Sequence, residues 1–257
     1  MRRALMGGWW LVVWVALAGI SIEAARGQVR EKAKAKRGEK AKTGPSATTP
    51  VPRKDAWWIK RHEEMNARVK KGNVDLIFIG DSITQGWEGG GKQVWDEFYG
   101  KRNAVNLGIG GDQTQHVLWR LANGNIKDIS PKLAVLMIGT NNVHAFKPEE
   151  IAAGVKAIVQ KLRAELPETK ILVLAIFPRG PNKEDPLRQA VVKTNELLAN
   201  VGDGKMVRFL DIGPKFLQED GTLSKEIMPD LLHLSTKGYR IWAEAIEPVV
   251  AEVLGAK

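Results

Sequence analysis

VDLIFIGDSITQ occupies residues 74–85 of the sequence. Its first part, Val74–Ile79, is a short run that is apolar at every position except Asp75, and such a run is typical of a strand buried in a parallel sheet. The run ends in Gly80-Asp81-Ser82, where a tight turn can present the Ser82 hydroxyl above the edge of the sheet. This stretch therefore predicts an α/β fold in which the first strand leads directly to a nucleophilic side chain.

The rest of the chain repeats this alternation of strand and helix. Apart from Val74–Ile79, strands are expected at Ala104–Leu107, Leu133–Ile138, Lys170–Phe177 and Met206–Asp211. Helices are expected at Asp55–Lys71, Gln115–Ala122, Pro148–Leu166, Pro186–Val201 and Thr236–Leu254. Because strands alternating with helices pair in parallel, the pattern predicts one five-stranded parallel sheet with helices on both faces.

Polar residues gather where the strands are expected to end. Residues 80–82, 108–112 and 139–142 each follow one of the first three strands, and Asp230 and His233 precede the last helix. Ligands of such folds bind beyond the carboxyl ends of the strands. We therefore expect these segments to form the functional site.

Ser82, His233 and Asp230 have the chemistry of a catalytic triad. A serine hydroxyl is a weak nucleophile unless a neighbouring base takes its proton. The chain has four histidines, and only His233 has a loop carboxylate three residues before it, that of Asp230. One turn can place both side chains on the same side, so that Asp230 accepts from Nδ1 and Nε2 faces Ser82.

An acyl-transfer site also needs donors for the oxyanion of the tetrahedral intermediate. The candidates are the backbone N–H groups of Ser82 and Gly111 and the side-chain amide of Asn141. Trp87, in the glycine-rich segment after the nucleophile, is expected to line the cleft.

Four blocks resemble the SGNH or GDSL-type hydrolases and occur in the family's order. They are GDSIT at 80–84, NLGIGGD at 106–112, GTNN at 139–142 and DLLH at 230–233. Over about Val74–Glu252 the chain is most similar, within that family, to the esterases that resemble the catalytic subunits of platelet-activating-factor acetylhydrolase Ib.

The resemblance implies a flavodoxin-like three-layer fold and a Ser-His-Asp mechanism that passes through an acyl-enzyme and uses no metal or cofactor. It implies that the Ser82 and Gly111 N–H groups and the Asn141 amide form the oxyanion hole. It also implies an acyl pocket narrowed to short, acetyl-like groups. The pocket residues would be Ile83, Thr140 and Leu232.

The charge of the chain is concentrated near its N-terminus. The net charge is +10, but residues 1–54 hold twelve Lys and Arg against three Glu, so the remainder is nearly neutral. A nucleic-acid-binding domain would carry its basic patch in the folded part, and no nucleic-acid partner is expected. The absence of cysteine excludes disulfides and thiolate zinc sites.

The N-terminus predicts export. Residues 1–27 resemble a signal peptide, with Arg2 and Arg3, an apolar stretch at 9–20 and small residues at 24–27. An uncleaved membrane anchor is the alternative. Residues 28–54, rich in Lys, Ala and Pro, predict a disordered linker that could contact an anionic surface. The hydrolase domain is expected to span 55–257.

Alternatives for substrate and function stay open at this stage. The ester could be a lipid or an extracytoplasmic glycan, and a carbohydrate O-acetylesterase would use the same mechanism. A non-catalytic surface-binding module of the same fold is the competing class, and a homodimer is possible. The intact Ser82, His233 and Asp230 favour an enzyme.

Overall fold

The computed structural model describes residues 46–256, which form a five-stranded parallel sheet in the order β2-β1-β3-β4-β5. The strands are β1 (Leu76–Gly80), β2 (Ala104–Gly108), β3 (Leu133–Met137), β4 (Lys170–Leu174) and β5 (Val207–Leu210). The expected parallel α/β sheet is confirmed, with all five strands at the expected places.

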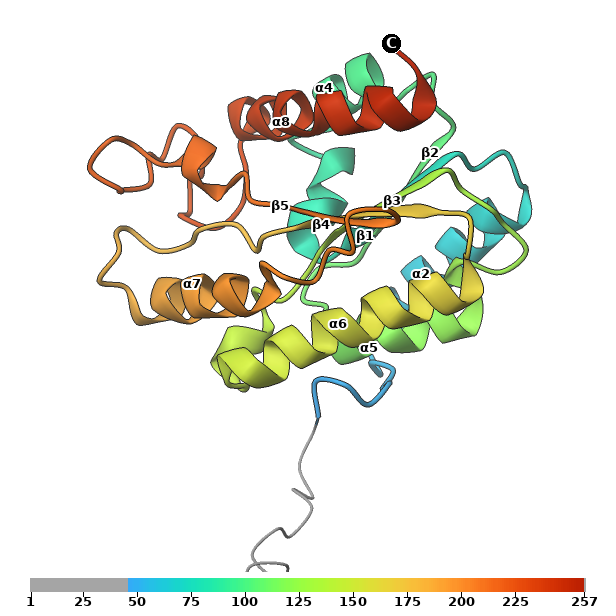
Figure 1. Cartoon of the computed structure of the whole chain (residues 1–257), viewed down its shortest axis with the longest axis horizontal. Coiled ribbons are helices and arrows are strands. Elements are labelled where there is room, and N and C mark those ends of the chain that lie inside the picture. Colours follow the sequence, from blue (N-terminus) through green and yellow to red (C-terminus); the bar gives the residue numbers. More distant parts are fainter. Residues whose placement is uncertain (1–45, 257) are drawn as a thin grey trace, which may run out of the picture. The chain divides into compact units, whose positions relative to one another are not determined.

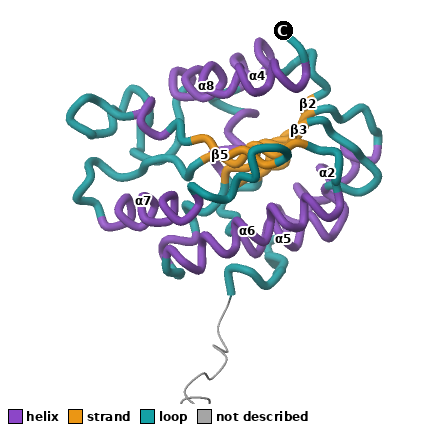
Figure 2. The backbone as a smooth tube through the Cα atoms, in the orientation of Figure 1, coloured by secondary structure: helices purple, strands orange, loops and turns teal. Residues whose placement is uncertain are grey.

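Helices cover both faces of this sheet (Figures 1 and 2). They are α2 (Ala56–Lys70), α3 (Ser82–Gln85), α4 (Lys92–Phe98), α5 (Thr114–Arg120), α6 (Pro148–Glu165), α7 (Pro186–Leu198) and α8 (Thr236–Leu254). In Figure 1, α2, α5, α6 and α7 lie on one face, while α4 and α8 lie on the other.

β1 contributes side chains to the hydrophobic cores on both faces of the sheet. Ile77 and Ile79 belong to the cluster under α2, α5 and α6, whereas Leu76 and Phe78 belong to the cluster under α4 and α8. Successive side chains of a strand point to opposite faces, so a strand covered on both faces has to be apolar throughout. This is why the uninterrupted apolar residues 76–79 are a reliable signal of the fold.

Trp87 belongs to the second core, and the prediction that it lines the cleft is wrong. Its side chain is fully buried and packs against Tyr239 and Trp242, with ring centroids 4.5 and 5.0 Å away. The short 3-10 turn Gly86–Glu88 that follows α3 carries the ring inward. Burial of so large an apolar surface favours this position over an exposed one.

The strand register brings the ends of three strands together. Gly80 at the end of β1 pairs with Gly108 of β2 and with Met137 of β3. Glycine is required at two of these ends, because a Cβ on Gly80 would lie 2.0 Å from Thr84 Oγ1 and one on Gly108 would lie 2.4 Å from the Gln85 nitrogen. The absence of these side chains lets α3, which begins with Ser82, pack directly on the sheet.

Two boundaries differ from the expected ones for a local reason. β4 ends at Leu174 instead of Phe177, because the backbone N–H and C=O of Ile176 pair with the side-chain amide of Asn195. The expected helix 115–122 ends its regular part at Arg120, and non-helical dihedral angles follow at Asn123 and Gly124.

The compact unit begins at Ser46, within the segment expected to be a linker. Ala47 is 2% exposed and its carbonyl accepts a 2.8 Å hydrogen bond from Thr114 Oγ1. The Val51 N–H donates to the Gln115 carbonyl at 3.2 Å. The expected signal peptide, 1–27, and linker residues 28–45 lie outside the described residues. Within 46–256, no helix is long and apolar enough to cross a membrane.

Candidate active site

Ser82 stands at the first position of α3, where β1 ends. Asp81 caps this helix, since its Oδ1 accepts a 3.0 Å hydrogen bond from the Ile83 N–H. Ser82 itself is half-buried, and its Oγ lies 2.9 Å from Nε2 of His233. At this distance the hydroxyl can donate its proton directly to a neutral imidazole.

Asp230 holds the other side of the imidazole. Its Oδ2 lies 2.6 Å from Nδ1 of His233, and its Oδ1 accepts from the backbone N–H groups of His233 and Leu232 at 2.7 and 3.1 Å. Leu231 between them has φ of 60° and is anchored by the Gly180 N–H, 2.9 Å from its carbonyl. A non-glycine residue in this left-handed region marks a constrained turn, and here the turn directs both side chains toward Ser82.

The charge state of Asp230 suits an acceptor of the Nδ1 proton. Partial burial acts to raise the pKa of Asp230, but hydrogen bonds from the His233 side chain and backbone outweigh it, and the pKa lies below its usual value of 3.8. The carboxylate is therefore ionised at neutral pH. It fixes the tautomer in which Nδ1 carries the proton and Nε2 is free to accept one.

The candidate oxyanion donors lie in the loops that follow β2 and β3. Gly111 has φ of 76°, a conformation that suits glycine. A Cβ built on the preceding Gly110 would lie 3.7 Å from the Ser82 Cβ, so this loop lies beside the nucleophile. Asn141 joins the two loops, because its Nδ2 donates to the Asp112 carbonyl at 2.9 Å and has a second N–H to offer.

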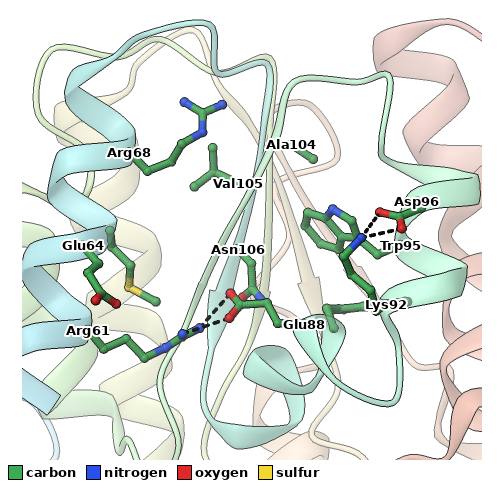
Figure 3. A pocket seen from close by; sticks show the side chains of 12 residues that line it. Arg61, Glu64, Arg68, Glu88, Lys92, Trp95, Asp96, Ala104, Val105 and Asn106 are labelled. Carbon is green, nitrogen blue, oxygen red and sulfur yellow. Dashed lines mark hydrogen bonds and ion pairs between the residues drawn. The ribbon is translucent and has the colours of Figure 1, made fainter. Parts of the chain in front are cut away.

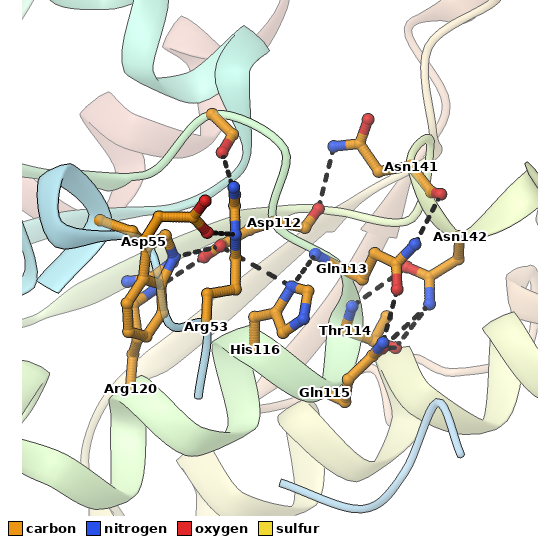
Figure 4. Close-up of polar contacts among 12 residues, drawn as sticks. Arg53, Asp55, Asp112, Gln113, Thr114, Gln115, His116, Arg120, Asn141 and Asn142 are labelled. Carbon is orange, nitrogen blue, oxygen red and sulfur yellow. Dashed lines mark hydrogen bonds and ion pairs between the residues drawn. The ribbon is translucent and has the colours of Figure 1, made fainter. Parts of the chain in front are cut away.

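Asp112 anchors the loop that follows β2 (Figure 4). Its side chain is fully buried and accepts hydrogen bonds from Trp58 Nε1 at 2.6 Å and from Arg120 Nε at 2.7 Å. These hydrogen bonds were not predicted from the sequence. A charged residue in the middle of an apolar helical pattern, as at Arg120, is the one signal that could have pointed to a buried ion pair.

The three residues expected to shape the acyl pocket differ in exposure. Ile83 and Thr140 are each 1% exposed, whereas Leu232 is half-buried. Arg179 closes over Thr140 and donates to its carbonyl and its Oγ1 at 2.9 and 3.2 Å. These hydrogen bonds connect Arg179 to the loop after β3.

A cavity of about 380 Å³ lies elsewhere, at the edge strand β2. Residues of α2 and α4 line it, and a bidentate ion pair between Arg61 and Glu88 lies at its side (Figure 3). Ser82, His233 and Asp230 are not among its lining residues. It is thus separate from the candidate active site.

Asp81 is a fully buried acid next to the nucleophile. Among the described residues its Oδ2 has no hydrogen-bond partner. Burial, and then the charge of Asp112, raise the pKa of Asp81 to about 7. A buried carboxyl without a partner for one oxygen is more stable when it is protonated.

The raised pKa of Asp81 predicts that the stability of the fold depends on pH. Between its ordinary pKa of 3.8 and about 7, the folded chain holds a proton that the unfolded chain releases. The free energy of unfolding therefore falls as pH rises from 3.8 to about 7, by at most about 1.4 kcal/mol per pH unit. Asp81→Asn removes this titration while keeping an oxygen that can cap α3. We expect chemical denaturation at pH 4.5 and pH 8 to show a smaller loss for Asp81→Asn than for the wild type.

The control is Asp96→Asn, which removes an exposed carboxylate of α4. This variant is expected to lose as much stability between the two pH values as the wild type. A wild-type loss that Asp81→Asn shares in full would show that Asp81 is not the titrating group.

The sequence of this chain is similar to those of known acylhydrolases. The model of the GDSL-like Lipase/Acylhydrolase family matches residues 78–241. Subunit alpha1 of human platelet-activating factor acetylhydrolase IB is 39% identical over 201 residues, which cover 78% of this chain and 85% of the relative. Subunit alpha2 from Rattus norvegicus is 40% identical over 202 residues, covering 78% and 86%.

A solved structure shares the fold at lower identity. A GDSL-like lipase from Bacteroides thetaiotaomicron superposes with a TM-score of 0.59 at 22% identity. The match covers 76% of this chain and 98% of the lipase.

Proposed function

The chain belongs to the GDSL-like lipase/acylhydrolase family and hydrolyses esters, and we propose that it does so as a serine esterase with Ser82 as nucleophile, His233 as general base and Asp230 as its orienting acid. One observation carries this proposal. An unbroken hydrogen-bonded chain runs from the Ser82 hydroxyl through both imidazole nitrogens to the Asp230 carboxylate, with distances of 2.9 and 2.6 Å.

Acylation would begin with attack of Ser82 Oγ on the ester carbonyl carbon, as its proton passes to Nε2 of His233. The carbonyl oxygen becomes an oxyanion that the Ser82 and Gly111 N–H groups and the Asn141 amide stabilise. When the intermediate collapses, the C–O bond to the alcohol breaks and the imidazolium gives its proton to the leaving oxygen. The acyl group is then an ester of Ser82.

Deacylation reverses these roles with water as the nucleophile. Nε2 of His233 takes a proton from water, and the resulting hydroxide attacks the acyl carbon. The second tetrahedral intermediate uses the same donors. Its collapse breaks the bond to Ser82 Oγ, which recovers the proton from His233, and a carboxylic acid is released.

A short, acetyl-like acyl group is part of this proposal. Two relatives at 39–40% identity are named acetylhydrolases. Ile83 and Thr140, which the proposal places near the acyl group, are 1% exposed each, so a long acyl chain would have to displace closely packed side chains there. The alcohol part of the ester is proposed to come from a lipid or from a glycan.

The acyl-length dependence tests this pocket. We expect kcat/KM for p-nitrophenyl esters to be highest with acetate and to fall through butyrate to octanoate, because longer chains would have to displace buried side chains. The alcohol is the same throughout, so only the acyl group varies. A rate that rises with chain length would refute the short pocket and leave the esterase assignment intact.

Export is also proposed, on the strength of the signal-like residues 1–27. The Lys-rich residues within 28–54 would then contact an anionic surface outside the membrane. Sequencing the N-terminus of the mature protein tests this directly. A mature chain beginning at Gln28 is the expected result, and one that keeps Met1 would contradict cleavage at this site.

A further inference from the structure

We propose that Arg53 is a positioning residue for the oxyanion hole, because it orients and polarises the peptide group between Gly110 and Gly111. This inference rests on the proposed function, in which the Gly111 N–H is an oxyanion donor. Arg53 precedes the region matched by the family model, residues 78–241, and lies in the segment expected to be a linker.

Arg53 contacts the carbonyl of the peptide group whose N–H, that of Gly111, is the candidate oxyanion donor. Arg53 Nη1 donates to the Gly110 carbonyl oxygen at 2.7 Å. That carbonyl and the Gly111 N–H belong to one planar trans peptide, in which C=O and N–H point in opposite directions. Fixing the oxygen therefore also fixes the direction in which the Gly111 N–H points.

The peptide group between Gly110 and Gly111 has little steric restraint of its own on its orientation. Glycines on both sides give it little steric resistance to rotation, since glycine adopts positive and negative φ with similar ease. The preceding peptide is held by Gln85, whose Oε1 accepts from the Gly110 N–H at 2.7 Å. Arg53 supplies the equivalent restraint for the next peptide, the one that carries the candidate donor.

Arg53 is itself held in place by its neighbours (Figure 4). Its Nε donates to Asp55 Oδ2 at 3.0 Å, and its guanidinium lies 5.0 Å from the centroid of the Trp57 ring. The side chain is only 20% exposed. Asp55 immediately precedes α2, so the start of this helix sets the position of the guanidinium.

A side chain at position 111 would require the guanidinium of Arg53 to move. A Cβ on Gly111 would lie 2.9 Å from Arg53 Nη1, closer than real Cβ atoms approach a neighbour. The glycine at 111 thus both permits the positive φ and admits the guanidinium.

The charge of Arg53 would add to the orientation effect. A cationic donor on the carbonyl oxygen withdraws electron density from the peptide and strengthens its N–H as a donor, as hydrogen bonds in a chain polarise one another. The gain would be greatest when the substrate oxygen becomes negative, and hence in the transition state. The contribution of Arg53 should therefore appear in kcat and much less in KM.

The kinetic test replaces Arg53 by alanine and by lysine. Loss of an entire oxyanion donor lowers kcat by about 10²–10³, so a donor left misaligned should lower it by about 10–100-fold. We expect Arg53→Ala to show this loss in kcat with p-nitrophenyl acetate, at nearly unchanged KM and melting temperature. Arg53→Lys should recover part of it, because it keeps the charge without the planar fork, and added guanidinium ion should partly rescue Arg53→Ala.

Arg68→Ala is the matched control. Arg68 also donates to backbone carbonyls, those of Gly72 and Asn73 at 2.9 and 3.2 Å, but at the far end of α2. The kcat of Arg68→Ala is expected to equal that of the wild type. A kcat for Arg53→Ala equal to the wild-type value would overturn the inference, as would a loss no larger than that of Arg68→Ala.

A structural readout separates this inference from the proposed function. Crystal structures of the wild type and of Arg53→Ala should show the 110–111 peptide ordered in the first and rotated or in several orientations in the second. An unchanged, well-ordered peptide in the variant would overturn the inference even if the enzyme is active. A wild-type protein without esterase activity would refute the proposed function instead, and the crystal structures would still decide the role of Arg53.

Discussion

Replacing Ser82 by alanine is expected to lower kcat for p-nitrophenyl acetate by a factor of about 10⁴ or more. The variant lacks the hydroxyl oxygen that lies 2.9 Å from Nε2 of His233, and without this nucleophile no acyl-enzyme can form. The candidate oxyanion donors remain in place, so a small residual rate above that of water is expected. The measurement is steady-state turnover by purified, folded protein.

The control for this prediction is Ser130→Ala. Ser130 is an exposed residue of the loop before β3, and its replacement should leave kcat unchanged. Substantial turnover by Ser82→Ala would show that another group attacks the ester, or that water attacks it directly.

Replacing Asp230 by asparagine is expected to lower kcat by a factor of about 10⁴. The amide oxygen can still accept from the Leu232 and His233 backbone N–H groups, so the turn should persist. Its NH₂ group, however, would face Nδ1 of His233 as a donor. The imidazole would then favour the tautomer with its proton on Nε2, and it could no longer accept the proton of Ser82.

Asp220→Asn is the matched control for Asp230→Asn. Asp220 is an exposed loop carboxylate that also accepts hydrogen bonds from a backbone N–H and from a side chain, both of Thr222. We expect it to retain wild-type kcat. If Asp230→Asn kept most of the activity while crystals showed the same turn, Asp230 would have no role beyond shaping the loop.

The sheet could be predicted from sequence because a strand buried on both faces needs apolar residues at every position. Residues 76–79 show this directly, and Leu133–Met137 of β3 repeats it. The expected ends of the strands then indicated the candidate site, since glycine and polar residues follow each of the first three strands. The short helix α3 was not expected, because four residues are too few for a periodic pattern.

Side chains were harder to place than strands. Trp87 was expected in the cleft because it follows the nucleophile in a glycine-rich segment, yet a 3-10 turn carries it into the core. The local sequence does not encode that choice, which depends on the space left between β1 and α8. Arg53 is a similar case, since its partner Gly110 lies 57 positions further along the chain.

The contacts among Ser82, His233 and Asp230 could be predicted from two kinds of information, one local and one from the family resemblance. Asp230 and His233 are close in sequence, and a single turn brings them together. The approach of His233 to Ser82, 151 positions away, depends on the whole sheet and on the loop before α8. The four blocks in family order supplied that information, which composition and periodicity lack.

The most direct test of the central claim is covalent labelling of the nucleophile. The wild-type enzyme is incubated with diethyl p-nitrophenyl phosphate, which leaves a stable phosphoryl adduct on an activated serine, and the modified peptide is identified by mass spectrometry. We predict a single adduct on Ser82, formed in step with the loss of esterase activity and absent from His233→Ala. Full inactivation with Ser82 unmodified, or an adduct on a different residue, would contradict the account.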